Sequence, residues 1–259
     1  MMRLEFSKVS ISLALALALP SLAGAGMYDP AAGQPGSLAI SDHDPRFVEW
    51  ASGYLNYIKG SPINNSFTDP TQTLGPARGT TTNVTELGDG GQITLTFANP
   101  IVSSGTGPDF VVFGNAFSST YLKLAYVDVS QDDVTWYRMP DYSETPGPVG
   151  TYGASDPTNI FGLAGKYQVG YGVGFSLSEV GLASASYVRL VDVVGDGSDK
   201  DSAGNPIYDP TPNSNGFNAA GVGVFSEAVP EPASVVLVLI AGASIAAGRA
   251  WRRRRLAGI

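Results

Sequence analysis

Cysteine is absent from the 259-residue sequence, and histidine occurs only once, as His43. The absence of cysteine excludes disulfides, thiol nucleophiles and thiolate metal centres, while it leaves an oxidising destination open. A single histidine excludes a zinc site built from several imidazoles. The sequence also has no Gly-x-Ser-x-Gly turn, which presents the nucleophile in many serine hydrolases. We therefore expect a protein without a catalytic centre.

Long helical segments are scarce as well, because 32 glycines and 18 prolines recur along the chain. Residues 45–58 are the exception, and a short N-terminal helix is predicted there. Bulky side chains fall at helical spacing in this segment: Phe47, Trp50, Tyr54 and Ile58. Pro45 suits the first turn of such a helix and Gly60 suits its end, with residues 42–44 as the cap.

Short apolar alternations between turn clusters are abundant, a pattern typical of β-sandwiches and barrels. Six strands are predicted, at residues 92–97, 110–113, 123–130, 135–139, 187–194 and 221–225. Residues 99–100, 105–108 and 142–153 are predicted loops. The interval 26–228 is long enough for one β domain with its own core. The predicted fold class is therefore mainly β, with a single sandwich.

The first 25 residues have the pattern of a secretion signal, which is not part of the fold. Arg3 and Lys8 give a basic start, and residues 11–19 form an apolar run that a proline ends. The small residues Ala23-Gly24-Ala25 suit a signal peptidase. We predict a signal peptide over residues 1–25.

The C-terminal end has three parts in a fixed order. Pro230-Glu231-Pro232 precedes an apolar stretch at residues 233–248, and Trp251 and the arginines 252–255 follow. The stretch is somewhat shorter than the roughly 20 apolar residues that span a bilayer comfortably. We predict a transmembrane helix over residues 233–251, with its arginines held on the cytoplasmic side by the positive-inside rule.

This order of tripeptide, apolar helix and arginine cluster resembles the PEP-CTERM sorting signal. The resemblance implies that exosortase, a transpeptidase-like membrane protease, recognises the tripeptide and removes the tail after transient insertion in the inner membrane. It also implies a Gram-negative-type envelope and a cell-surface or extracellular-matrix destination, often linked to exopolysaccharide. Residues 229–259 are then the sorting tail and residues 26–228 the exported domain. An ordinary membrane anchor that retains its tail is the alternative.

Two segments of the domain resemble the jelly-roll sandwiches of the discoidin-like, galactose-binding type. Residues 125–136 (AYVDVSQDDVTW) are similar to the strand-turn-strand of that family, although Asp133 replaces the usual glycine of the turn. Residues 185–190 (ASYVRL) are similar to a later strand with an aromatic-Val-Arg triplet. The resemblance implies a jelly-roll-like sandwich with Trp136 in the core.

The exported domain is strongly acidic. Residues outside 26–228 carry seven of the 15 basic and two of the 23 acidic residues, so 8 basic and 21 acidic residues remain, a net charge of −13. A surface of this charge repels nucleic acid and anionic membranes. Cations and neutral polymers such as glycans are the partners that it suits.

Aspartates are concentrated in a glycine-containing segment after the strand predicted at residues 187–194. Calcium takes six to eight hard oxygen ligands, often from such loops. The predicted ligands of one structural Ca²⁺ are Asp196, Asp199, Asp201 and Asp209. Residues 199–204 partly imitate the start of an EF-hand, but Ala203 fills a ligand position and no glutamate closes the loop. A solvated acidic turn is the alternative.

Tyrosines in loops rich in glycine and proline complete the candidates, at positions 142, 152, 167 and 171. Sugar rings stack on exposed aromatic faces, and loops at one end of a sandwich commonly carry binding sites. Tyr152 and Tyr171 are the predicted glycan contacts. The leading function is a non-catalytic, exported surface or matrix protein associated with polysaccharide. A secreted glycoside hydrolase with a carboxylate pair and a purely structural matrix protein are the alternatives.

Overall fold

The computed structural model describes residues 26–225, which consist of strands, turns and four short 3-10 helices. The predicted signal peptide, the Pro-Glu-Pro tripeptide and the predicted transmembrane helix lie outside these residues. Within residues 26–225, no helix is long and apolar enough to cross a membrane.

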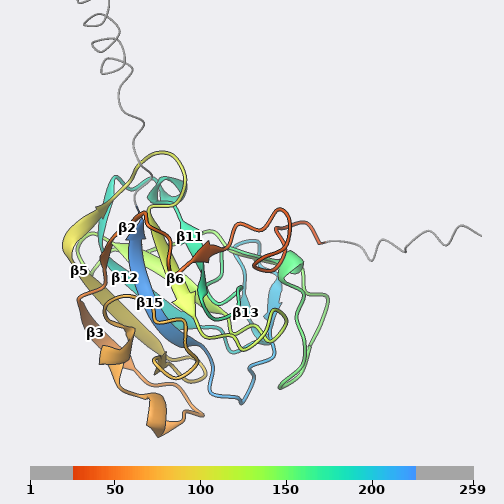
Figure 1. Ribbon diagram of the computed structural model, residues 1–259. Coiled ribbons are helices and arrows are strands. Elements are labelled where there is room, and N and C mark those ends of the chain that lie inside the picture. The colour runs from red at the N-terminus through yellow and green to blue at the C-terminus, as the bar shows by residue number, and fades with distance from the viewer. Residues whose placement is uncertain (1–25, 226–259) are drawn as a thin grey trace, which may run out of the picture.

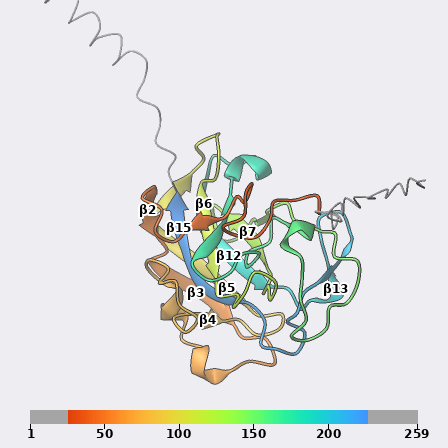
Figure 2. The ribbon, with the colours of Figure 1, turned by 45° about the vertical axis from the view of Figure 1, so that its right-hand side comes forward.

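Two antiparallel sheets form a β-sandwich (Figure 1, Figure 2). The first sheet has the order β1-β11-β6-β15-β2, with β4 also paired to β15, and the second has the order β3-β5-β12-β7-β8. The first sheet comprises β1 (Ile40–Ser41), β2 (Phe47–Trp50), β4 (Thr85–Glu86), β6 (Phe110–Gly114), β11 (Tyr171–Phe175) and β15 (Asn218–Phe225). The second comprises β3 (Gly53–Ile58), β5 (Gln92–Val102), β7 (Ala125–Ser130), β8 (Tyr137–Arg138) and β12 (Ser184–Asp192). The predicted mainly β sandwich is confirmed.

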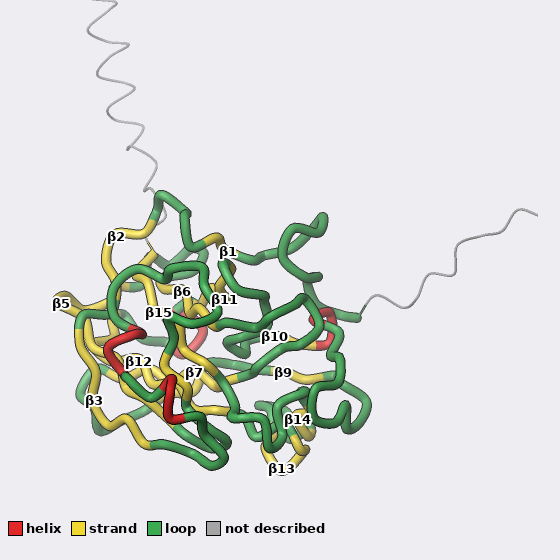
Figure 3. Tube along the Cα trace, turned by 60° about the horizontal axis from the view of Figure 1, so that its bottom comes forward, coloured by secondary structure: helices red, strands yellow, loops and turns green. Residues whose placement is uncertain are grey.

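Two small ribbons flank the sandwich. Figure 3 shows β9, β10, β13 and β14 together at the end of the molecule away from β3 and β5. Their bounds are β9 (Tyr142–Ser143), β10 (Ile160–Phe161), β13 (Asp196–Lys200) and β14 (Pro206–Tyr208). The 3-10 helices are η1 (Asn65–Phe67), η2 (Pro70–Thr73), η3 (Pro157–Asn159) and η4 (Leu177–Val180).

The apolar run of β6 supplies the centre of the first sheet. Phe110 and Val112 join the main core, to which β5, β7 and β12 of the second sheet also contribute. Val111 and Phe113 join a separate apolar cluster with the aromatic residues of β2. All four side chains are at most 1% exposed. The strand is thus covered on both faces, which explains its unbroken apolar sequence.

The predicted helix at residues 45–58 is wrong, because this segment forms β2 and β3. A bulge interrupts the pairing of β2 with β15. Because the bulge adds one residue, Phe47 and Trp50 reach the same side and both contact Phe113. Two aromatic residues three positions apart on a bulged strand therefore have the same spacing as residues on one face of a helix. Residues 42–44 accordingly precede a strand and have no helix to cap.

The six predicted strands are confirmed, although several of their ends are shifted. The loop predicted at residues 99–100 lies inside β5, where the register between β5 and β12 is irregular. Trp136, which was expected in the core, is only partly buried. The Arg189 guanidinium lies 4.1 Å from the centroid of the Trp136 ring, and the Tyr187 ring packs against the Trp136 ring in an edge-to-face arrangement.

Candidate functional site

The four aspartates predicted to bind calcium accept hydrogen bonds from backbone N–H groups. Asp196 and Asp199 accept from nearby residues, at 2.8 Å each. Asp201 accepts at 2.9 Å from β9, and Asp209 accepts at 3.0 Å from the residue before β7. Among residues 26–225, no three acidic, histidine or cysteine side chains are grouped so that they could hold a metal ion. The hydrogen bonds of these carboxylates stabilise turns and hold neighbouring loops together. Calcium binding by the four aspartates stays a prediction.

Thermal melting with calcium and with chelator tests that prediction. A ligand that binds only the folded state, at a hundredfold excess over its Kd, adds about 2.7 kcal/mol to the free energy of unfolding. For a domain of this size the gain corresponds to several degrees in Tm. If the four aspartates share one ion, calcium raises Tm by that amount and Asp199→Asn removes the difference. Superimposed curves would contradict calcium binding.

Asp141, beside the same loop, is expected to make stability depend on pH. Its side chain is 1% exposed, one oxygen accepts from the Ser202 hydroxyl at 3.2 Å, and the other has no protein partner among the described residues. Burial raises the pKa of Asp141 to about 6, whereas an unfolded aspartate has a pKa of about 3.9. The folded state thus binds the proton more tightly, and this contribution is lost as pH rises from about 4 through about 6.

Asp141→Asn should therefore flatten the pH dependence of the free energy of unfolding between about pH 4 and 7. Because an uncharged amide avoids the cost of burying a carboxylate, the variant should also be more stable at neutral pH, by on the order of 1–3 kcal/mol. Denaturant unfolding at several pH values measures both effects. Parallel curves for the variant and the original protein would contradict a perturbed Asp141.

Three stacked aromatic rings lie on the surface, and we call Phe117, Tyr121 and Tyr152 the aromatic ladder. The ring centroids of Phe117 and Tyr121 are 5.7 Å apart with planes inclined by 7°, and those of Tyr121 and Tyr152 are 6.2 Å apart with planes inclined by 17°. The two outer residues are 59% (Phe117) and 74% (Tyr152) exposed. Contiguous exposed rings of this kind make the ladder a candidate binding surface.

Loops that are distant in sequence hold the ladder together. The Tyr121 hydroxyl lies 3.3 Å from the hydroxyl of Ser214. The Tyr152 N–H donates to the Pro210 carbonyl at 2.9 Å, and the Ser155 N–H donates at 2.8 Å to the loop that carries Tyr121. The loops after β6, β9 and β14 therefore converge on one surface.

The backbone of Tyr152 adopts a conformation that residues with side chains rarely take. Its φ is 64°, in the left-handed region. That conformation costs about 1–2 kcal/mol relative to the right-handed one for a residue other than glycine. A strained backbone at a highly exposed aromatic ring is a pattern that supports a functional contact at this position.

A buried charged cluster lies next to the ladder. Lys123 is 4% exposed, and its Nζ lies 5.6 Å from the centroid of the Phe117 ring. Burial lowers the pKa of Lys123, and four carboxylates oppose that shift: Glu86, Asp192, Asp209 and Asp89. Burial also raises the pKa of Asp209 to about 7. Opposite charges near the buried ammonium offset part of its desolvation cost.

The two tyrosines predicted as glycan contacts lie in different surroundings. Tyr152 belongs to the ladder, whereas Tyr171 lies on β11 and packs, partly buried, against the main core. Phe117 and Tyr121 were missed by sequence reasoning. The signal available for them was a pair of aromatics around the Ser-Ser-Thr run at residues 118–120.

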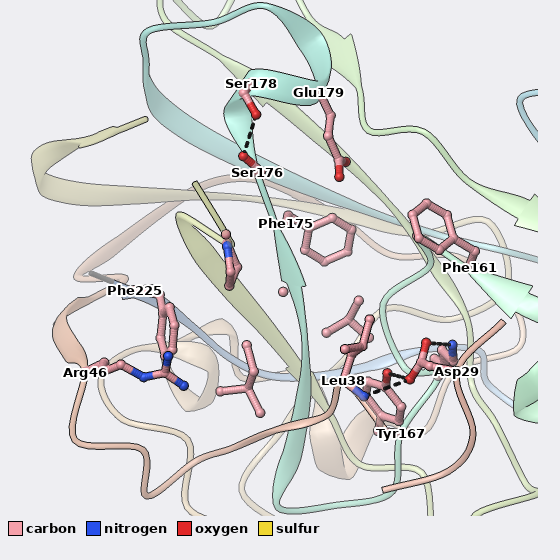
Figure 4. Close-up of a pocket in the computed structure, with 17 residues that line it drawn as sticks. Asp29, Leu38, Arg46, Phe161, Tyr167, Phe175, Ser176, Ser178, Glu179 and Phe225 are labelled. Carbon is pink, nitrogen blue, oxygen red and sulfur yellow. Dashed lines mark hydrogen bonds and ion pairs between the residues drawn. The ribbon is translucent and has the colours of Figure 1, made fainter. Parts of the chain in front are cut away.

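A pocket of about 510 Å³ is the other candidate site. Part of the pocket wall is the edge of β11 that faces away from β6. β1 pairs with this edge only at residues 171–172, so the edge carries no neighbouring strand at Gly174 among the described strands. Figure 4 shows Phe175, Phe161 and Leu38 around the space, so its lining is largely apolar.

Charged side chains lie on two sides of that lining (Figure 4). Lys166 and Tyr167 both donate to the carboxylate of Asp29, and the Lys166 side chain is only 2% exposed. Burial lowers the pKa of Lys166, and the contact with Asp29 opposes that shift. On the other side, the Arg46 guanidinium pairs with Asp44 at 2.8 Å.

Residues 228–255 match the PEP-CTERM protein-sorting motif. The motif marks an exported protein that is sorted to the cell surface, and it implies processing by an exosortase-type membrane protease. The predicted resemblance of this end of the sequence to the PEP-CTERM sorting signal is therefore confirmed. The comparison with curated proteins gives no match.

Two solved structures are similar to the domain. One is a pectin-binding carbohydrate-binding module, with 11% identity, a TM-score of 0.37, and coverage of 71% of this chain and 96% of that chain. The other is CBM32-3 from a family 31 glycoside hydrolase of Clostridium perfringens, with 12% identity, a TM-score of 0.29, and coverage of 73% and 95%.

Proposed function

We propose that the exported domain binds a neutral polysaccharide through the aromatic ladder and has no catalytic activity of its own. The observation that carries the proposal is the row of stacked rings, exposed by 59% at Phe117 and 74% at Tyr152. The apolar faces of sugar rings can pack on such rings. Exposed hydroxyl groups at Ser118 and Thr120 adjoin the ladder, where sugar hydroxyls can bond to them.

The charge of the domain favours a neutral ligand over an anionic one. At a net charge of −13 the domain repels nucleic acid and anionic lipid. Lys123, a basic group that lies beside the Phe117 ring of the ladder, is 4% exposed and faces four carboxylates. Stacking and hydrogen bonding to an uncharged polymer need no compensating cation, so binding should change little with salt.

Calorimetric titration of the purified domain with a neutral envelope polysaccharide, at low and high salt, tests this function. We expect weak binding with nearly equal affinity at both salt concentrations. No heat with any polysaccharide would favour a purely structural matrix protein, and tight salt-sensitive binding would contradict the charge argument. Polysaccharide turnover that a single aspartate substitution abolishes would instead show a hydrolase.

We further propose that the sorting motif leads to removal of the tail after transient anchoring in the inner membrane. The mature surface form should then lack the arginines 252–255, and intact-mass measurement of that form decides the point. Glu231→Ala should leave the protein in the inner membrane at full length. A full-length C-terminus on the surface form of the unaltered protein would mean that the tail is an ordinary anchor.

A further inference from the structure

We infer that the 510 Å³ pocket is a second ligand site, for a compact molecule that carries an ammonium group beside a sugar-like or apolar ring. The inference goes beyond the proposed function, because the pocket lining includes none of the three ladder residues. The charged groups of the pocket differ in whether an opposite charge already compensates them.

Both basic groups of the pocket already have carboxylate partners. Lys166 is paired with Asp29, and Arg46 is paired with Asp44. Glu179, in contrast, takes part in no ion pair within residues 26–225. Glu179 is thus the charged side chain of the lining that has no opposite charge in an ion pair within residues 26–225, inside a domain whose net charge is −13.

Glu179 is placed at the mouth of the pocket by η4. Figure 4 shows its carboxylate directed toward the ring of Phe175, with Phe161 on the other side of the space. The buried Asp109 fixes the start of this turn by accepting from the Leu177 N–H at 2.8 Å. Burial raises the pKa of Glu179, and the nearby Asp109 adds to that rise. A cation bound beside the Glu179 carboxylate would favour its charged form and so offset both contributions to the raised pKa.

The aromatic lining supports the same class of ligand. An ammonium group is attracted both to a carboxylate and to an aromatic face, and Phe161 and Phe175 offer such faces beside Glu179 (Figure 4). The apolar lining at Leu38 and Val173 can hold the carbon face of a ring. A volume of about 510 Å³ falls in the range of small-molecule pockets, about 300–1,000 Å³. An amino sugar combines all these features.

Titration with glucosamine at neutral pH, followed by backbone amide NMR shifts, tests the inference, with glucose as the neutral control. We expect glucosamine to shift signals of residues 173–179 and to bind roughly tenfold or more tightly than glucose, the gain typical of a bond to a charged group. Added salt should weaken the binding, unlike binding at the ladder. Equal affinity for glucose, or no shift in these residues, would overturn the inference.

Two matched variants locate the effect. Glu179→Gln should weaken glucosamine binding roughly tenfold without lowering Tm, because the substitution breaks no ion pair within residues 26–225. Glu144→Gln removes the same charge from an exposed position outside the pocket and should leave affinity nearly unchanged. Tyr152→Gly removes a ring of the ladder and should bind glucosamine with unchanged affinity. Loss of binding at the ladder can therefore be distinguished from loss of binding in the pocket. Equal losses in the two glutamine variants would show a general charge effect and contradict a site in the pocket.

Discussion

Tyr152→Gly should remove most polysaccharide binding while leaving the domain at least as stable as before. The ring is 74% exposed, so little core packing is lost with it. The backbone φ of 64° suits glycine better than tyrosine, so the substitution also relieves strain. If the ring anchors the ligand, its loss should cost about 2 kcal/mol of binding energy, or roughly thirtyfold in Kd. Calorimetry and thermal melting on the same preparation measure both quantities.

Two further variants serve as a second test of the ladder and as a control outside it. Phe117→Ala removes the other exposed ring of the ladder and should also weaken binding. Tyr54→Ala removes a tyrosine of β3 that is 39% exposed and lies outside the ladder, so binding should persist. Unchanged affinity in Tyr152→Gly, or an equal loss in Tyr54→Ala, would contradict a ligand stacked on the ladder.

Asp29→Asn should be among the most destabilising single polar substitutions in the domain. The carboxylate of Asp29 accepts from Lys166, Tyr167 and the Leu38 N–H, and the Lys166 side chain is 2% exposed. Without the carboxylate, a buried ammonium has no opposite charge beside it. Such a loss costs about 3–5 kcal/mol, which lowers Tm by roughly ten degrees in a domain of this size.

The double variant Asp29→Asn with Lys166→Met separates a buried charge from lost packing. Because it removes both charges, it should recover much of the stability that Asp29→Asn alone loses. Asp44→Asn, in the more exposed pair with Arg46, should cost at most about 1 kcal/mol. A double variant no more stable than the single one would show that Asp29 acts through its hydrogen bonds instead.

Sequence periodicity was sufficient for most of the sheet framework. The run 110–113 and the alternation at 92–97 were both found, because burial on two faces or on one leaves a local pattern. The segment containing Phe47 and Trp50 was misassigned, because its bulge depends on pairing with β15, which is far away in the sequence. A bulge of that kind leaves no signal within a short window.

The functional surfaces were less accessible from sequence. Tyr152 was selected as a loop tyrosine, but its partners Phe117 and Tyr121 become visible only when two distant loops meet. The pair of Asp29 and Lys166 joins residues that are 137 positions apart. Local composition contains no information on such contacts.

The central claim is that the ladder is where a polysaccharide binds, and NMR mapping with a neutral oligosaccharide tests it most directly. Aromatic side-chain signals would be followed through the titration in the unaltered domain. We predict that the ring signals of Phe117, Tyr121 and Tyr152 shift together along one saturation curve, while those of Tyr54 do not move. Saturable shifts confined to other residues, with the three ladder rings unaffected, would contradict the claim.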